Sequence, residues 1–446
     1  MVRQTRRTFL TVSGAVLGGI ATGTTVAAAT RRDRYIVQTS GNADLGAVEV
    51  VHELPGVDIA VVRGDEADLD QARGVKAYAP DVEVRLGDPD VNDAAPTVDE
   101  ASAADEPGYG LQWDKQALGV PEAHDTTKGE GTRVAIIDTG VAAGHPDLEV
   151  NEELSRNFTG DGFGAANAAG GYHGTHVGGI VGASDNGAGV IGTAPATELV
   201  DCRVFSPNSL ASFGDILAAV VYSAEIGADA ANLSLGAYPI PRQGNGEFYG
   251  KVLNRTMTYA NKEGTLLVIA AGNDSADLQH DKNFISLPNE GAQGLSVAAT
   301  GPIGFGWGED GLEDPPESPA FYTNYGTNDI DLGAPGGDAD LEAIGSGVDW
   351  YLDLVFNTIA YPQYKYETDD EETVTGITGY DYTYDWLAGT SMAAPQVAGA
   401  AALVKSVNPD YNAGQVEAAL ERAADVPDDY DKTFYGSGFL NLTDAL

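Results

Sequence analysis

The chain has 446 residues, enough for more than one domain. It carries 67 Asp and Glu residues against 24 Lys and Arg, a formal net charge of -43 at pH 7. This balance excludes a nucleic-acid partner bound through basic patches and opposes stable association with an anionic membrane. A single cysteine, Cys202, excludes an intramolecular disulfide framework.

The acidic residues are spread along the whole chain, and their mutual repulsion opposes a compact fold at low salt. Concentrated salt screens this repulsion, because the Debye length falls to about 3 Å at about 1 M ionic strength. The composition therefore predicts a protein adapted to high salt. An ordinary acidic secreted protein is the alternative.

The first 29 residues predict an export signal. Arg6 and Arg7 precede a short apolar stretch, and Ala27, Ala28 and Ala29 offer a small-residue cleavage site. The order Arg-Arg-Thr-Phe-Leu resembles a twin-arginine signal. We therefore expect twin-arginine export and a secreted, extracellular protein, with a retained membrane anchor as the alternative.

Two units are expected after the signal. Residues 30–86 predict a small α+β unit, with strands at 35–37, 57–62 and 82–84 and a helix at 66–73. Residues 87–108 are rich in Asp, Ala and Pro and predict an acidic linker that contains the processing region.

Residues 109–446 predict an α/β unit, because short apolar runs alternate with helical patterns. The strands are expected at 133–137, 198–204, 228–235, 265–271 and 295–299, and the helices at 173–181, 215–226, 252–263, 391–407 and 413–423. Such apolar strands need cover on both sides, which predicts a parallel sheet flanked by helices on both faces. Residues 301–386 break the alternation and predict an acidic surface insertion, with a calcium site or a substrate-facing flap as alternatives.

Three segments place hydrolytic residue types at strand ends and helix starts, where α/β folds build active sites. Asp138 ends the run Val-Ala-Ile-Ile-Asp, His173 opens His-Gly-Thr-His-Val-Gly-Gly, and Ser391 follows Thr390 before an apolar helix. A serine needs a base for its proton, histidine suits that task, and a buried carboxylate orients the imidazole. Together they predict a catalytic triad. Singly, each residue has an ordinary alternative as a turn, core or capping residue, and the spacing of His173 and His176 also permits a metal site.

The three segments resemble the signatures of subtilisin-like serine proteases, from about Gly110 to Leu446 outside residues 301–386. Within that family the chain is similar to secreted haloarchaeal halolysin-type enzymes. The resemblance implies a monomeric endopeptidase that cleaves polypeptide substrates through an acyl-enzyme. A catalytically silent binding or scaffold protein with the same fold and an esterase are the alternatives.

The resemblance also assigns roles outside the triad. Asn273, after an apolar strand and Gly272, matches the asparagine that donates its amide to the oxyanion. A second set matches the substrate-binding edge and, loosely, the pocket for the residue before the scissile bond: Ser234, Leu235, Gly236 and Ser286.

Calcium and an inhibitor are implied as well. Gln112, Asp147 and Asn186 match ligands of the family's strong calcium site, with a glycine-rich turn and a capping aspartate as the alternative. The unit at residues 30–86 resembles the prodomain, an intramolecular inhibitor until self-cleavage, which is expected within residues 87–109. Gln396 departs from the family pattern, which has histidine there.

Overall fold

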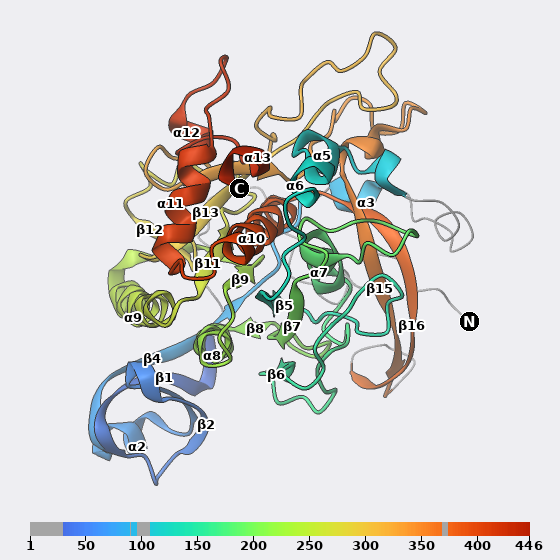
Figure 1. The fold of residues 1–446 in the computed structure, drawn as a ribbon. Coiled ribbons are helices and arrows are strands. Elements are labelled where there is room, and N and C mark those ends of the chain that lie inside the picture. Colours follow the sequence, from blue (N-terminus) through green and yellow to red (C-terminus); the bar gives the residue numbers. More distant parts are fainter. Residues whose placement is uncertain (1–29, 90, 96–107, 368–372) are drawn as a thin grey trace.

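A parallel sheet of seven strands lies at the centre of the computed structural model, which describes residues 30–89, 91–95, 108–367 and 373–446 (Figure 1). The expected export signal lies outside these residues. In spatial order the strands are β14 (Leu332–Pro335), β13 (Gly294–Thr300), β11 (Leu266–Ala270), β9 (Ala230–Leu233), β5 (Arg133–Asp138), β7 (Glu198–Arg203) and β6 (Arg156–Asn157).

Both faces of this sheet are buried. On β5, Val134 and Ile136 join one hydrophobic core, whereas Ala135 and Ile137 join the other, as the two-residue period of a strand requires. The larger helices are α7 (His173–Gly182), α8 (Phe213–Glu225), α9 (Glu247–Glu263), α10 (Thr390–Val407) and α11 (Ala413–Ala423). Helices α7, α10 and α11 contribute to the first core, and α8 and α9 to the second. The expected α/β class with a helix-covered parallel sheet is confirmed.

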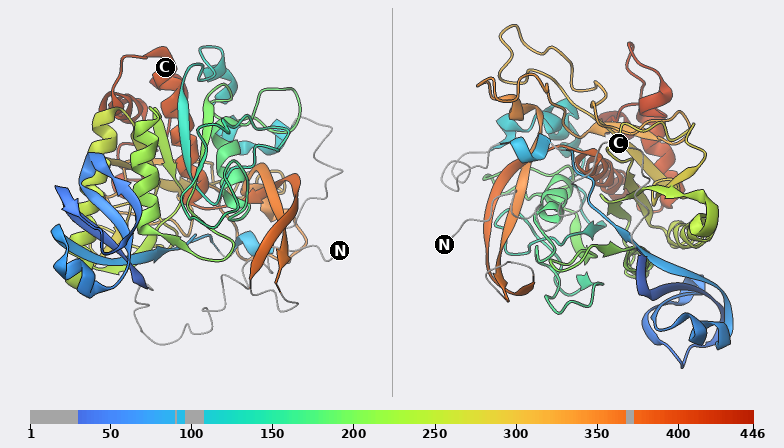
Figure 2. Two further views of the ribbon diagram at one scale, coloured as in Figure 1. Left: turned by 90° about the horizontal axis from the view of Figure 1, so that it is seen from below. Right: turned by 180° about the vertical axis from the view of Figure 1, so that it is seen from behind.

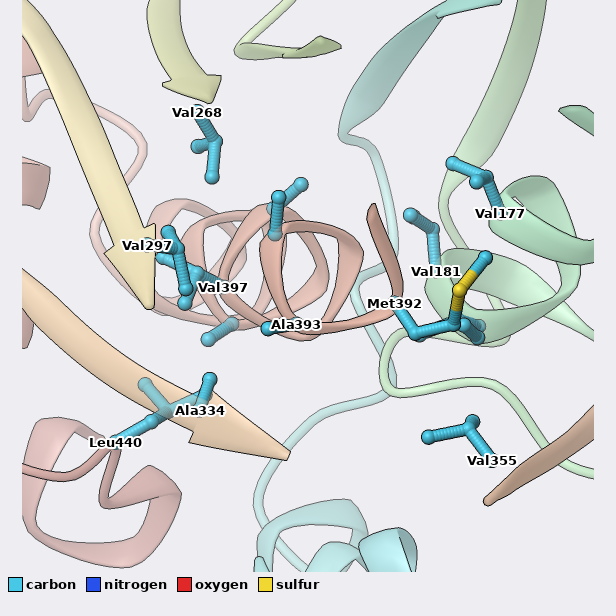
Figure 3. Packing of buried hydrophobic residues seen from close by; sticks show 14 of the residues in the cluster. Val177, Val181, Val268, Val297, Ala334, Val355, Met392, Ala393, Val397 and Leu440 are labelled. Atoms are coloured by element: carbon cyan, nitrogen blue, oxygen red, sulfur yellow. The ribbon is translucent and has the colours of Figure 1, made fainter. Parts of the chain in front are cut away.

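Helix α10 runs through the larger core and packs against β9, β11, β13 and β14. Ala393 and Val397 lie toward Val297, and Met392 lies toward Val181 of α7 (Figure 3). Small alanine side chains let this helix approach the sheet and α7 closely. Ser391, in the first turn, is therefore held by a well-packed core.

A buried polar cluster ties α10 to the short helix α5 (Trp113–Ala117), which is followed by α6 (Val120–His124). The Nζ of Lys115 donates to the Oε1 of Gln396 at 2.6 Å and to the Oγ1 of Thr193 at 2.9 Å. The Nε2 of Gln396 donates to the Oδ2 of Asp114 at 2.7 Å. Burial lowers the pKa of Lys115 to about 8, against the pull of Asp114. The amide at 396 thus satisfies a lysine and a carboxylate at once.

The N-terminal unit is an antiparallel sheet with strand order β2-β3-β1-β4-β8. Its elements are β1 (Thr30–Asp44), β2 (Glu49–Leu54), β3 (Ile59–Arg63), α2 (Glu66–Gln71), β4 (Arg73–Val84) and, from the second unit, β8 (Ala211–Ser212). The unit packs on α8 and α9 (Figure 2). At this contact, buried Asp81 accepts hydrogen bonds from Ser212 Oγ at 2.7 Å and Gly214 N at 2.9 Å, at the start of α8. A carboxylate there offsets the positive end of the helix dipole.

Residues 301–386 are only in part the expected surface insertion. They include β14, which is an edge strand of the central sheet. They also include most of a long hairpin of β15 (Val355–Tyr366) and β16 (Val374–Leu387), drawn in orange in Figure 1. The segments 355–360 and 383–387 of this hairpin are buried. Because the region is acidic, its sequence does not predict a strand of the central sheet or a hairpin with buried segments at 355–360 and 383–387.

Further elements are the pair β10 (Ala237–Pro241) and β12 (Phe284–Leu287), and the short helices α3 (Val91–Ala94), α12 (Lys432–Tyr435) and α13 (Leu442–Ala445). Within the described part of the chain, no helix has the length and apolar character needed to cross a bilayer.

Gly179 of α7 lets the hairpin base approach this helix. A Cβ atom at Gly179 would lie 2.1 Å from Thr358 Oγ1 and 2.2 Å from Asn357 Oδ1. Replacing a helical glycine by alanine ordinarily stabilises a protein by about 0.5–1 kcal/mol. We predict the opposite sign for Gly179→Ala, a loss of about 1–3 kcal/mol, because the methyl group would displace two buried side chains. Denaturant unfolding measures this difference.

Gly250→Ala in α9 is the matched control. A Cβ there meets only Ile285 Cδ1, at an ordinary 3.7 Å. This variant should be neutral or stabilised. Equal stability changes in the two variants would contradict the proposed packing at Gly179.

Candidate active site

Asp138 and His173 form a buried pair at the carboxyl end of β5. Asp138 ends this strand, and His173 begins α7, so both lie at one edge of the sheet. The Nδ1 of His173 lies 2.8 Å from Oδ1 and 3.0 Å from Oδ2 of Asp138. Both side chains are almost fully buried. The carboxylate therefore fixes the orientation of the imidazole ring, with Nδ1 toward Asp138 and Nε2 on the opposite side.

A second carboxylate faces His173. The Oδ1 of Asp88, from the chain that follows the N-terminal unit, lies 3.5 Å from its Nε2. Burial lowers the pKa of His173, but Asp138 and Asp88 outweigh that effect and raise it to about 9. In this arrangement the imidazole is protonated at neutral pH.

Ser391 lies beside Ser234. The Ser391 hydroxyl donates to the Ser234 carbonyl oxygen at 3.4 Å, and the Ser234 hydroxyl donates to the Ser391 carbonyl oxygen at 2.8 Å. Within the described residues, His173 Nε2 has no hydrogen-bond partner. The structure thus joins His173 to Asp138 by hydrogen bonds and holds Ser391 in a conformation that is not bonded to the histidine.

Asn273 is oriented by the start of α10. Its Oδ1 accepts hydrogen bonds from the backbone N–H and the hydroxyl of Thr390, each at 2.9 Å. Because a backbone N–H can only donate, the Asn273 oxygen must face Thr390 and its Nδ2 must face the other way. That Nδ2 donates to the Gly87 carbonyl oxygen at 2.6 Å.

The chain between the two units passes through this site as an extended strand. Glu83 pairs with Ser212 in an antiparallel ladder, and Arg85 forms an antiparallel bridge with Gly236. Gly87 then reaches Asn273, and the next residue, Asp88, reaches His173. The Gly87–Asp88 peptide bond therefore joins a residue whose carbonyl oxygen binds Asn273 to a residue whose carboxylate faces His173.

The chain stays docked beyond this bond. Asn92 Nδ2 donates to the Ala388 carbonyl oxygen at 2.9 Å, and the Ala388 N–H donates to Asn92 Oδ1 at 2.8 Å. Val91 is buried in the larger core. Val91, Asn92 and Ala95 of the expected linker are thus buried, and the amide of Asn92 pairs with backbone three residues before Ser391. Residues 90 and 96–107 lie outside the described part.

Comparison with known proteins identifies the family. The model of the subtilase family, Peptidase S8, matches residues 129–438. Subtilisin Savinase of Lederbergia lenta is 30% identical over 75% of this chain and 98% of that protein. The chain belongs to the subtilase family. An alkaline protease of Shouchella clausii is 27% identical over 98% of both chains. A solved protease of Pseudoalteromonas arctica is 26% identical, with a TM-score of 0.58 over 77% of this chain and 98% of that structure. The protein is accordingly a subtilisin-like serine protease, a hydrolase that acts on polypeptides, as the sequence predicted.

The residues expected to form the substrate-binding edge lie where the extended strand passes. Ser234 contacts Ser391, Gly236 pairs with Arg85, and Leu235 between them is buried. Ser286 lies on β12, which pairs with β10 just after Gly236, and it is buried. Its backbone N–H donates to Glu290 Oε1 at 2.9 Å. No contact joins Ser286 to Gly87 among the interactions of the described residues, so its expected role stays a prediction.

His176, the second histidine of the motif, binds the backbone of the hairpin. The Nε2 of His176 lies 3.1 Å from the Val355 carbonyl oxygen and 3.2 Å from that of Asp385. Because carbonyl oxygens only accept, this nitrogen carries a proton and is not available to a metal. Within the described residues, no group of three or more His, Cys, Asp or Glu side chains could hold a metal ion.

The residues expected to bind calcium lie in or beside one loop, residues 184–191. Their side-chain oxygens accept hydrogen bonds within the protein, and this arrangement does not fit a cation. Asp147 accepts hydrogen bonds from Asn186 Nδ2 at 2.7 Å, Val190 N at 2.9 Å and Tyr384 Oη at 2.9 Å. Gln112 exchanges two hydrogen bonds with the Ile191 backbone, both at 3.0 Å. N–H and O–H groups aimed at a carboxylate occupy the positions that calcium would need to share.

The sequence does not predict that Gly87 contacts Asn273, that Asp88 faces His173, or that Thr390 orients Asn273. Gly87 and Asp88 were placed in a linker, since nothing in their local pattern distinguishes a docked strand from a solvated one. The sequence marks Thr390 only as the residue before Ser391, whereas in the structure its hydroxyl and N–H orient Asn273. The distance of Asp88 from the triad along the chain left no local signal for its role.

Proposed function

We propose that this subtilase is an exported, salt-adapted serine endopeptidase made as a self-inhibited precursor, with Ser391 as nucleophile. The observation that carries the proposal is the Gly87–Asp88 peptide bond. Its carbonyl oxygen accepts from Asn273, and the side-chain carboxylate of Asp88, the residue that follows it, faces His173. An oxyanion donor and a general base on the two sides of one peptide are the geometry that acyl transfer needs.

In the proposed reaction, Ser391 Oγ attacks the carbonyl carbon of a substrate while His173 Nε2 accepts the hydroxyl proton. The Ser391 side chain must first rotate from the Ser234 carbonyl oxygen toward His173. Asn273 Nδ2 and the Ser391 N–H stabilise the oxyanion, and Asp138 stabilises the imidazolium. The imidazolium then protonates the leaving amine, the C–N bond breaks, and water hydrolyses the acyl-enzyme by the same steps.

The N-terminal unit at residues 30–86 acts, in this proposal, as an intramolecular inhibitor. Two observations support this role. Glu83 and Arg85 pair with Ser212 and Gly236, and Asp88 raises the pKa of His173. A protonated imidazole cannot act as a base, so the uncut chain is restrained by its own carboxylate. The expected cleavage region of residues 87–109 thereby narrows to the Gly87–Asp88 bond.

Export and salt adaptation rest on the sequence. The Arg6–Arg7 pair before an apolar stretch supports twin-arginine export, and the net charge of -43 supports a halophilic, secreted enzyme.

Activity and salt dependence are tested together on purified processed protein. In about 3 M KCl, where repulsion is screened, we expect casein hydrolysis that a serine-directed covalent inhibitor abolishes by labelling Ser391. In dilute buffer we expect loss of activity and of the far-UV circular dichroism signal. Ser391→Ala, purified in concentrated salt, should fold and neither react nor cleave. Ester cleavage without casein cleavage would contradict the endopeptidase, and full activity in dilute buffer would contradict the salt adaptation.

Self-cleavage of the precursor should occur between Gly87 and Asp88 and should accelerate as the pH rises toward 9. The raised pKa of His173 means that its base form, and hence the rate, is gained with rising pH. Asp88→Asn removes one carboxylate and lowers that pKa, so cleavage at pH 7 should be faster, by about tenfold per pKa unit. Early-time N-terminal sequencing and the pH–rate profile measure both effects.

Asp93→Asn is the matched control, because it removes an exposed carboxylate from the same segment. Its profile should equal that of the wild type, and Ser391→Ala should remain uncut. A first new N-terminus other than Asp88, or an unshifted Asp88→Asn profile, would refute the assignment.

Export is tested by replacing Arg6 and Arg7 with Lys, which should leave the protein inside the cell because the arginine pair is the recognised feature. Replacing the other arginine pair, Arg31 and Arg32, with Lys should leave secretion intact. Immunoblots of medium and cells report the outcome, and secretion of the first variant at the wild-type level would reject twin-arginine export.

A further inference from the structure

The carboxylate of Asp147 lies under the loop of residues 184–191 and is almost fully buried. Its three donors include two whose direction is certain. The Val190 donor is a backbone N–H. The Asn186 donor is fixed because the Oδ1 of that amide accepts from the Ala188 N–H at 2.9 Å, which turns its Nδ2 toward Asp147. The side-chain oxygen of Asn186 is therefore engaged by the loop and does not face Asp147.

The loop backbone also packs directly on this carboxylate. Gly189 has φ +58, and a Cβ atom there would lie 1.9 Å from Asp147 Oδ2 and 2.2 Å from the Tyr384 hydroxyl oxygen. The space does not admit a methyl group. Calcium takes about 6–8 oxygen ligands at about 2.3–2.6 Å, so it would have to open this packing and turn two donors away.

The third donor comes from the hairpin. Tyr384 lies on β16, and its hydroxyl reaches Asp147 Oδ2 at 2.9 Å. The Tyr384 ring meets His145 edge to face, with centroids 5.4 Å apart, and His145 Nε2 donates to the Thr383 carbonyl oxygen at 2.9 Å. One hairpin segment thus supplies both the hydroxyl and the acceptor that bind the segment around Asp147.

The far side of the hairpin base is equally anchored. His176 donates to the carbonyl oxygens of Val355 and Asp385, and Gly179 leaves room for the Asn357 and Thr358 side chains. The Tyr384 hydroxyl is therefore presented by a strand fixed on α7, not by a loose loop.

From these contacts we propose that the β15–β16 hairpin stabilises the loop of residues 184–191 in this protein, in the way that a bound metal ion would. The Tyr384 hydroxyl and two loop N–H groups satisfy the charge of Asp147, and the loop of residues 184–191 is closed by hydrogen bonds in place of calcium. The inference concerns stability and is independent of the proposed catalytic roles.

The first test compares thermal unfolding of wild type and Asp147→Asn, each with calcium and with a chelator in concentrated KCl. We expect the same calcium-dependent shift in melting temperature for both proteins, because Asp147 binds no calcium. A larger shift in wild type would mean that Asp147 is a ligand and would overturn the proposal. Should Asp147→Asn fail to fold, Asn186→Ala, in the partly exposed loop, serves the same comparison.

The second test compares Tyr384→Phe with Tyr361→Phe. Tyr361 lies on the same hairpin, and its hydroxyl also donates to a carboxylate, Asp385 Oδ2 at 2.6 Å, but within the hairpin itself. Losing a hydrogen bond to a buried charge should lower the melting temperature of Tyr384→Phe by about 2–3 °C. Limited proteolysis should then cut residues 184–191 in Tyr384→Phe and not in Tyr361→Phe. Equal protection of the loop in both variants would overturn the proposal that Tyr384 holds this loop closed.

Discussion

One imidazole lies between two carboxylates, and the reaction that we propose depends on this position. Asp138 lies against Nδ1 of His173, and Asp88 lies 3.5 Å from Nε2. Burial favours the neutral ring, yet the two charges prevail and keep it protonated. Asp88 belongs to the segment that the proposed reaction cleaves. The restraint on the base therefore lasts, in this proposal, as long as Asp88 stays in place.

Close backbone approach is the second organising feature. Gly179 and Gly189 each lie where a side chain would collide with the hairpin or with the carboxylate under it. These contacts make the hairpin part of the packed structure, joined to the motif helix α7 on one side and to the Asp147 loop on the other. The acidic region 301–386 therefore contains hairpin segments that are buried.

The large negative charge is borne mainly by the surface. Burial raises the pKa of Asp201, Asp338 and Glu417 to about 7, so these carboxyl groups carry a reduced charge near neutral pH. The buried cation Lys115 is held by Gln396 and Asp114, which avoids an unpaired charge next to α10. The solvent-exposed acids therefore set the dependence on salt that we propose.

The sequence by itself determined the alternation of strands and helices, the parallel sheet, and the family to which Asp138, His173 and Ser391 point. These features are carried by local patterns, namely apolar runs, helix starts and short motifs. Only the tertiary structure decided that Gly87–Asp88 lies in the site, that β14 belongs to the sheet, and that Tyr384 meets Asp147. Each of these depends on a contact between residues far apart in the chain, such as 237 positions for Tyr384 and Asp147. Local composition does not encode such contacts, because they arise from the packing of whole elements against one another.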